Sequence, residues 1–181
     1  LIKKELCFEA LRLGRVLLQN NAGSKSPSLT ALMALMCFQA SRLGTRISSN
    51  NEIVLLEDQD RTNWDASLVH EGLIFLEQSA KGECLSRFHL EAGIAACHST
   101  ATSYEATNWQ QIHQYYTDLM AVCPSPVIAL NKAIANAMNV GIESGIRELK
   151  RLKAIPQLRI IICIMQLWLT YTDEMMIKKM H

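Results

Sequence analysis

The sequence predicts an all-α fold. Apolar side chains recur every three or four residues along most of the chain, which is the period of one helix face, and only 53–56 has a brief strand-like pattern. With 181 residues, 49% of them apolar and 19% charged, the chain is long enough to bury the core of one ordinary domain. We therefore expect helices packed on helices.

The net charge, the cysteine pattern and the length of the apolar runs exclude several classes of protein. The net charge of +1 gives too weak a field to hold nucleic-acid phosphates. None of the six cysteines forms a C-x-x-C pair, which is typical of a chain kept reduced in the cytoplasm. No apolar run reaches the roughly 18 residues that a membrane span needs. We predict a cytoplasmic protein that binds neither membrane nor nucleic acid by itself.

The first half of the chain predicts two helices and a long connection. The first helix covers about 3–20 and ends in a polar stretch. The second begins at Ser26 or Ser28, because Pro27 fits the first turn, where a missing N–H costs nothing, and it continues toward Gly44. The connection over 45–61 is the least helical part of the sequence.

Two later helix starts share one pattern: 62–65 reads TNWD and, 45 residues further on, 107–110 reads TNWQ. In each, the threonine can cap an N–H three residues on while the Asp or Gln reaches back, as in a capping box. The predicted helices cover 62–81, 85–101, 107–122, 125–141 and 141–153. Consecutive helices would form stacked antiparallel pairs that resemble a tetratricopeptide-like helical array.

Four segments carry a further resemblance: LCFEALRLGRVLL at 6–18, ALMALMCFQASR at 31–42, IVLLEDQDRTNWD at 53–65 and PSPVIALNKAIA at 124–135. In this order they resemble the C-terminal extension of extracytoplasmic-function (ECF) RNA polymerase sigma factors that carry a tetratricopeptide-like domain. The resemblance covers about 1–158. It implies a regulatory or protein-contact region of a transcription initiation factor, with the promoter-reading domains upstream of Leu1. The implied partners are the RNA polymerase core and those upstream domains, and promoter DNA would be reached only through them.

The end of the chain departs from that resemblance. We divide the sequence into a helical-repeat domain over 1–158 and a tail of the same domain over 159–181. The resemblance implies an amphipathic helix like YHLYHAxLADLxRR after Leu158, whereas 160–168 reads IICIMQLWL. A DNA string that encodes 160–181, read two bases later, translates as YHLYYATLADLYRRNDDKKNA. We interpret the tail as a frame slip; the alternative is that 160–168 forms a buried closing helix.

The densest charged run is the candidate protein-contact site. It contains Glu57, Asp58, Asp60, Arg61, Trp64 and Asp65. One interpretation is an acidic surface for a basic partner. The other, which we favour, places the carboxylates at a helix N-terminus, where the macrodipole stabilises them, and lets Arg61 tie the loop to a neighbouring helix.

Other candidate sites are weaker. The group of His89, Glu91, Cys97 and His98 lacks the spacing of a helical zinc site, so we predict no metal, and we expect no cofactor or small-molecule substrate. Nucleotide-binding loops, nucleophile elbows and H-E-x-x-H motifs are missing from the sequence, so we expect no enzyme. A basic stripe contains Arg147, Lys150, Arg151 and Lys153 and is typical of a solvated face; the alternative is contact with DNA or the polymerase. The alternatives to the sigma-factor hypothesis are a free-standing tetratricopeptide-like scaffold and, third, a metal-dependent enzyme.

The frame slip predicts a specific DNA sequence. Resequencing the gene around the codon of Arg159 should recover one additional base, after which the frame encodes an amphipathic helix. Independent reads that keep the printed frame would contradict the interpretation.

Overall fold

The computed structural model describes residues 3–20, 26–48, 50–82 and 85–152. Within these residues the protein is all-α, with seven α-helices, one short 3-10 helix and no strand, and neighbouring helices pack against each other. The all-α prediction is therefore confirmed. The chain forms two compact units, 1–108 and 109–181. The predicted boundary at residue 158 and the tail after it lie outside the described residues.

The first two helices begin and end close to where the sequence places them. Helix α1 spans Lys4–Gln19 and α2 spans Pro27–Ser41. The hydroxyl of Ser26 accepts a hydrogen bond from the N–H of Leu29 at 3.3 Å, and Pro27 occupies the first turn of α2.

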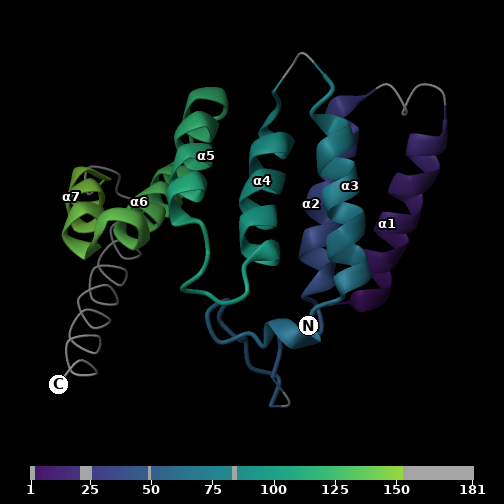
Figure 1. The fold of residues 1–181 in the computed structure, drawn as a ribbon, viewed down its shortest axis with the longest axis horizontal. Helices are drawn as coiled ribbons and strands as arrows, with labels where there is room; N and C mark the ends of the chain where they lie inside the picture. The colour runs from purple at the N-terminus through teal and green to yellow at the C-terminus, as the bar shows by residue number, and fades with distance from the viewer. Residues whose placement is uncertain (1–2, 21–25, 49, 83–84, 153–181) are drawn as a thin grey trace. The chain divides into compact units, whose positions relative to one another are not determined.

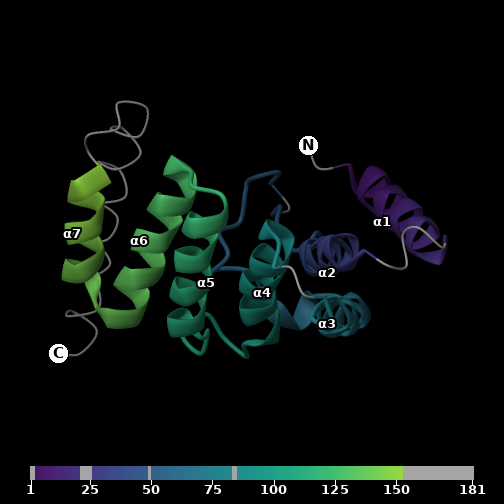
Figure 2. The same ribbon diagram turned by 90° about the horizontal axis from the view of Figure 1, so that it is seen from above.

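Helix α2 is the centre of the first unit. It packs against α1, against α3 (Ala66–Ser79) and against α4 (Arg87–Thr100), and α3 also contacts α4. Figure 1 shows these helices side by side, and Figure 2 looks along α2 and α3 and shows α1 inclined to them. The apolar residues of α2 extend around its whole circumference, which suits a helix that is covered by three others. Eight of its residues are buried.

Close approach between α2 and α3 depends on a missing side chain. A Cβ atom on Gly72 would lie 2.8 Å from Cε1 of Phe38, closer than packed atoms tolerate. Phe38 is 1% exposed and belongs to a cluster of α2 and α4 residues whose other members are alanines: Ala34, Ala92, Ala95 and Ala96. The large ring and its small neighbours together fill the space between the helices.

The second unit contains α5 (Trp109–Val122), α6 (Pro126–Val140) and α7 (Ile142–Leu152). Helix α6 packs against both of the others. Gly141 has a φ of 132°, which separates α6 from α7 and is accessible to glycine because it has no Cβ. The core of this unit consists of Leu130, Ala133, Ala137 and Leu149.

Both predicted capping boxes are wrong. Thr62 lies in the 3-10 helix Arg61–Asn63, where Asp60 accepts hydrogen bonds from its N–H at 2.9 Å and its hydroxyl at 2.6 Å. The N–H of Asp65, which the box would assign to Thr62, donates to the carbonyl of Ser41 at 2.8 Å, and α3 begins at Ala66 with Asp65 as its N-cap. At the second site, the Thr107 hydroxyl donates to the carbonyl of Ser103 at 3.3 Å, and α5 begins at Trp109. Because α5 begins at Trp109, the residue before it is Asn108, and Thr107 lies one position too early to be the N-cap.

In the described part of the chain, none of the helices combines the length and the apolar character that crossing a bilayer requires.

The contact between Gly72 and Phe38 predicts a stability effect. Gly72→Ala should lower the free energy of unfolding by about 1–3 kcal/mol, because the new methyl group overpacks against the ring. Gly44→Ala is the matched control, since a Cβ there meets nothing within 4 Å. Its free energy of unfolding should stay the same or rise by less than about 1 kcal/mol. Urea unfolding followed by circular dichroism measures both; equal effects would contradict the packing.

Candidate functional site

The candidate site is the connection between α2 and α3, which lies at one end of the helices of the first unit (Figure 1). Its first part is a short hairpin. Ile47 and Ile53 form an isolated antiparallel bridge, flanked by hydrogen bonds from Val54 N to Arg46 O at 3.0 Å and from Ser48 N to Glu52 O at 2.9 Å. Asn51 has a φ of 63°, a conformation that asparagine adopts more readily than most residues. The strand-like pattern at 53–56 thus forms one bridge.

Buried polar side chains hold this connection in place. Gln59 is 7% exposed, and its Nε2 donates to the carbonyl of Val54 at 3.0 Å. The indole N–H of Trp64 donates to Oγ1 of Thr45 at 3.0 Å, and the same oxygen lies 3.5 Å from Oε1 of Gln59. These contacts join the beginning of the connection to its end, and they satisfy polar atoms that would be costly to bury alone.

Arg61 joins the connection to α4. Its Nη1 donates to the carbonyl of His98 and, at 3.2 Å, to that of Ala101. The final carbonyls of a helix have no partner inside the helix and carry partial negative charge, so a guanidinium is well suited to them. The guanidinium also lies 4.8 Å from the centre of the Trp64 ring, a cation–π distance. Burial lowers the pKa of Arg61, although nearby Glu105 and Tyr104 act in the opposite direction.

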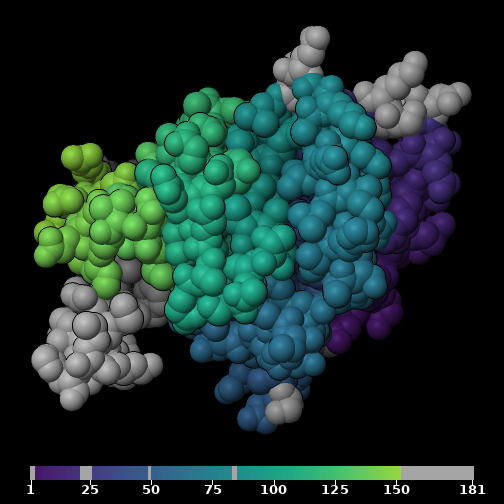
Figure 3. Space-filling view, in the orientation of Figure 1, coloured from purple at the N-terminus to yellow at the C-terminus, as the bar shows by residue number. Residues whose placement is uncertain are grey.

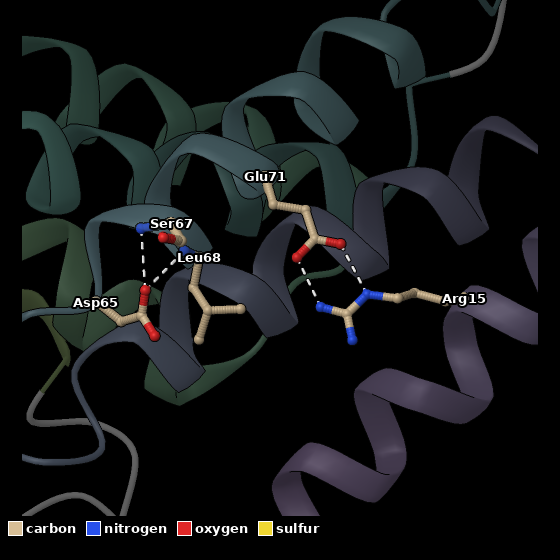
Figure 4. A network of polar contacts seen from close by, with 5 residues as sticks. All are labelled: Arg15, Asp65, Ser67, Leu68 and Glu71. Carbon is tan, nitrogen blue, oxygen red and sulfur yellow. Dashed lines mark hydrogen bonds and ion pairs between the residues drawn. The ribbon is translucent and has the colours of Figure 1, made fainter.

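Asp60 and Asp65 are capping residues. One oxygen of Asp65 accepts from the N–H groups of Ser67 at 2.9 Å and Leu68 at 3.1 Å, as Figure 4 shows. The N–H of Asp65 itself donates to the carbonyl of Ser41 at 2.8 Å, which links the end of α2 to the start of α3. Hydrogen bonds from Thr62 lower the pKa of the Asp60 carboxyl group. Both carboxylates are therefore used by the fold.

A bidentate ion pair joins α1 to α3. Nε and Nη2 of Arg15 on α1 donate to the two carboxylate oxygens of Glu71 on α3, at 2.7 and 2.6 Å (Figure 4). The hydrogen bond from Arg15 lowers the pKa of Glu71. The pair fixes α1 relative to α3 and leaves no free charge for a ligand.

The remaining members of the predicted site stay at the surface. Glu57 and Asp58 are exposed, and neither forms an ion pair with another described residue. Partial burial raises the pKa of Glu57, and the nearby charges of Asp58 and Glu105 raise it further. Glu57 and Asp58 are thus the two acids of the predicted site that cap no helix.

Sequence reasoning missed two exposed apolar residues in the same connection. Ile53 is 84% exposed and Leu55 is 55% exposed, whereas Val54 and Leu56 are half-buried. This alternation is the period of an extended segment and was visible in the sequence as the pattern at 53–56. The alternation in the sequence does not identify which of the two sides of the segment faces solvent.

The histidines of the weaker metal candidate have structural surroundings. Nδ1 of His89 accepts from the N–H of Ser86 at 3.1 Å, and Nε2 lies 3.2 Å from the carbonyl of Ser79, so the ring carries its proton on Nε2. Burial, together with Arg42 and Arg61, lowers the pKa of His98 to about 4. Within the described residues, no three or more His, Cys, Asp or Glu side chains are grouped so that they could hold a metal ion.

The predicted basic stripe lies on α7. Arg147, Lys150 and Arg151 are exposed there, while Lys153 lies outside the described residues.

An open pocket of about 440 Å³ adjoins Arg61 and Trp64, between the start of α3 and the end of α4. Nη1 of Arg61 is already bound to α4 carbonyls, and Nη2 is buried from solvent. We therefore assign no ligand to this pocket.

Comparison with known proteins gives one family and one relative. The profile of a family of unknown function, DUF6596, matches residues 1–80. An uncharacterized protein of Rhizobium meliloti (strain 1021) is 35% identical over 145 residues, which are 80% of this chain and 34% of that protein. The chain thus spans about a third of the length of the curated relative it matches. No solved structure matches the chain.

The different roles of the carboxylates predict different stability effects. Asp65→Ala should lower the free energy of unfolding by about 1 kcal/mol, because the N–H groups of Ser67 and Leu68 lose their acceptor. Asp58→Ala removes the same group from the same run and should change it by less than about 0.5 kcal/mol. Both values come from urea unfolding at pH 7. Equal losses would contradict the assignment of Asp65 as a cap and Asp58 as a surface residue.

Proposed function

We propose that this chain is the C-terminal regulatory and protein-contact region of a bacterial ECF-type RNA polymerase sigma factor. The four-segment resemblance supports the assignment to a sigma factor. The length of the relative agrees with it, since a protein about three times as long has room for further domains. The proposed partners are the polymerase core and the upstream domains of the same protein, and the proposed location is the cytoplasm.

The observation that carries a protein-contact function is an uncovered apolar stripe on α1. Leu6 is 62% exposed, Leu13 49% and Leu17 53%, and their spacing places all three on one side of the helix. Leu11 and Gly14 are buried and lie on a different side. The helix is thus apolar over more of its circumference than its packing uses, and contiguous exposed apolar surface is typical of a protein interface.

Such a contact would regulate initiation through a conformational equilibrium. If the stripe binds the upstream domains in one arrangement better than in another, it shifts the population toward that arrangement. The size of the shift is limited by the difference in affinity between the two arrangements. No reaction at the chain itself is required, so the proposal is a binding function.

Run-off transcription with the cognate core polymerase tests the proposal. A factor that ends before Leu1 should differ from the intact factor in transcript yield by about fivefold or more, the size of a typical coupling between sites. Leu13→Ser with Leu17→Ser should change the yield in the same direction. The control is Arg12→Gln, an exposed residue of the same helix, and it should leave the yield unchanged.

An unchanged yield after truncation would contradict the regulatory role. The gene provides an independent check, because a sigma factor requires an in-frame basic helix-turn-helix upstream of Leu1. A different upstream sequence would favour the free-standing scaffold.

A further inference from the structure

We propose that the connection between α2 and α3 carries a docking surface for a basic protein segment that presents an apolar side chain. The surface consists of Ile53, Leu55, Glu57 and Asp58, and we call it the acidic loop face. The inference rests on the proposed protein-contact function and deepens it by naming a second contact surface, separate from the stripe on α1, and the chemistry of its partner.

The apolar part of the surface is unusually open. Ile53 is 84% exposed, the highest value among the large apolar side chains that the structure describes, and Leu55 is 55% exposed. Their neighbours Val54 and Leu56 turn inward, so Ile53 and Leu55 share the outer side of an extended segment. Figure 3 shows the connection projecting beyond the ends of the helices, where a partner can reach it.

The acidic part lies directly beside them. The N–H of Asp58 donates to the carbonyl of Leu55 at 3.1 Å, so that Leu55, Glu57 and Asp58 belong to one turn. Glu57 precedes Asp58 in that turn, and neither carboxylate has a cationic partner among the described residues. Close like charges repel, and a basic partner would relieve that repulsion while its apolar side chain covers Ile53 and Leu55.

The surface is held in shape before any partner arrives. The bridge to Ile47 fixes Ile53, and Gln59 holds the carbonyl of Val54 between the two exposed residues. Thr45, Trp64 and Arg61 then connect this segment to α4. A segment that is already ordered loses little conformational entropy on binding, so contacts with its exposed groups contribute more fully to affinity.

The neighbouring carboxylates show that the exposed pair is not needed for capping. Asp60 caps the 3-10 helix and Asp65 caps α3, which accounts for two of the four acids in the run. Glu57 and Asp58 cap no helix. The charge on the acidic loop face is thus available to a partner.

Binding of defined peptides to the full chain tests the proposal. The probe is a labelled amphipathic helical peptide of leucine and lysine. The comparison peptides replace every lysine with glutamate or every leucine with lysine, so that they lack one of the two required properties. Fluorescence anisotropy should show about tenfold tighter binding of the leucine–lysine peptide than of either comparison peptide at physiological salt.

Paired variants locate the binding site. Ile53→Ser with Leu55→Ser, and Glu57→Gln with Asp58→Asn, should each weaken binding of the leucine–lysine peptide by about tenfold. The charge variant should also make affinity less dependent on salt. The controls Val127→Ser and Glu143→Gln change an exposed apolar and an exposed acidic residue elsewhere and should alter affinity by less than about twofold. Circular dichroism confirms that each variant remains folded.

The proposal would be overturned if both paired variants bound the leucine–lysine peptide as tightly as the unchanged chain does. It would also be overturned if the all-lysine peptide bound as tightly as the leucine–lysine peptide, because such binding would depend on charge alone. The test is separable from that of the proposed function. If truncation before Leu1 changes transcription but the paired variants bind normally, the acidic loop face is wrong and the sigma-factor proposal stands. If the variants lose binding and truncation has no effect, the docking surface stands and the sigma-factor proposal fails.

Discussion

The first unit depends on one interaction, the guanidinium of Arg61 at the end of α4. Without it, the carbonyls of His98 and Ala101 would lose a donor at a helix terminus that has no other means of satisfying them in its own backbone. The same guanidinium covers the ring of Trp64, and the indole N–H of Trp64 holds Thr45 at the start of the connection. Arg61 therefore anchors the connection between α2 and α3 to α4, and the bridge at Ile53 and the hydrogen bond from Gln59 to Val54 hold the exposed residues within it.

The elements that could be predicted are those set by local rules. The positions of α2 and α6 follow from a proline after a serine and from an apolar period, both of which act within a few residues, and the sequence placed both helices correctly. The capping boxes failed for an equally local reason. A threonine three residues before an acid satisfies the motif, but Asp60 caps a 3-10 helix that contains Thr62, and the acid itself, Asp65, is the N-cap of α3. Where two local hydrogen-bonding patterns compete, the sequence alone does not rank them.

The arrangement of the candidate site could not be predicted, because its contacts span long distances in sequence. Gln59 meets Thr45 across 14 residues, Trp64 meets Thr45 across 19, and Arg61 meets His98 across 37. None of these residues belongs to an apolar repeat from which its burial could be predicted. The role of Gly72 could not be predicted either. A glycine weakens a helix in isolation, and only the position of the Phe38 ring, on another helix, explains why a side chain at this position would not fit. Burial of polar residues and close backbone approach are properties of the packed unit.

The acidic run shows how far folding explains a sequence and where another requirement begins. Asp60 and Asp65 each accept hydrogen bonds that start a helix, so their charges lower the energy of the folded chain. Glu57 does the opposite, because partial burial raises the pKa of its carboxyl group and the nearby charges of Asp58 and Glu105 raise it further. Ile53 and Leu55 add apolar surface that the fold leaves in water. Repelling carboxylates and uncovered aliphatic side chains both make the isolated chain less favourable, and both are relieved by the same kind of partner, one that is basic and partly apolar. A single binding event thus accounts for two features that the packing of the helices does not require.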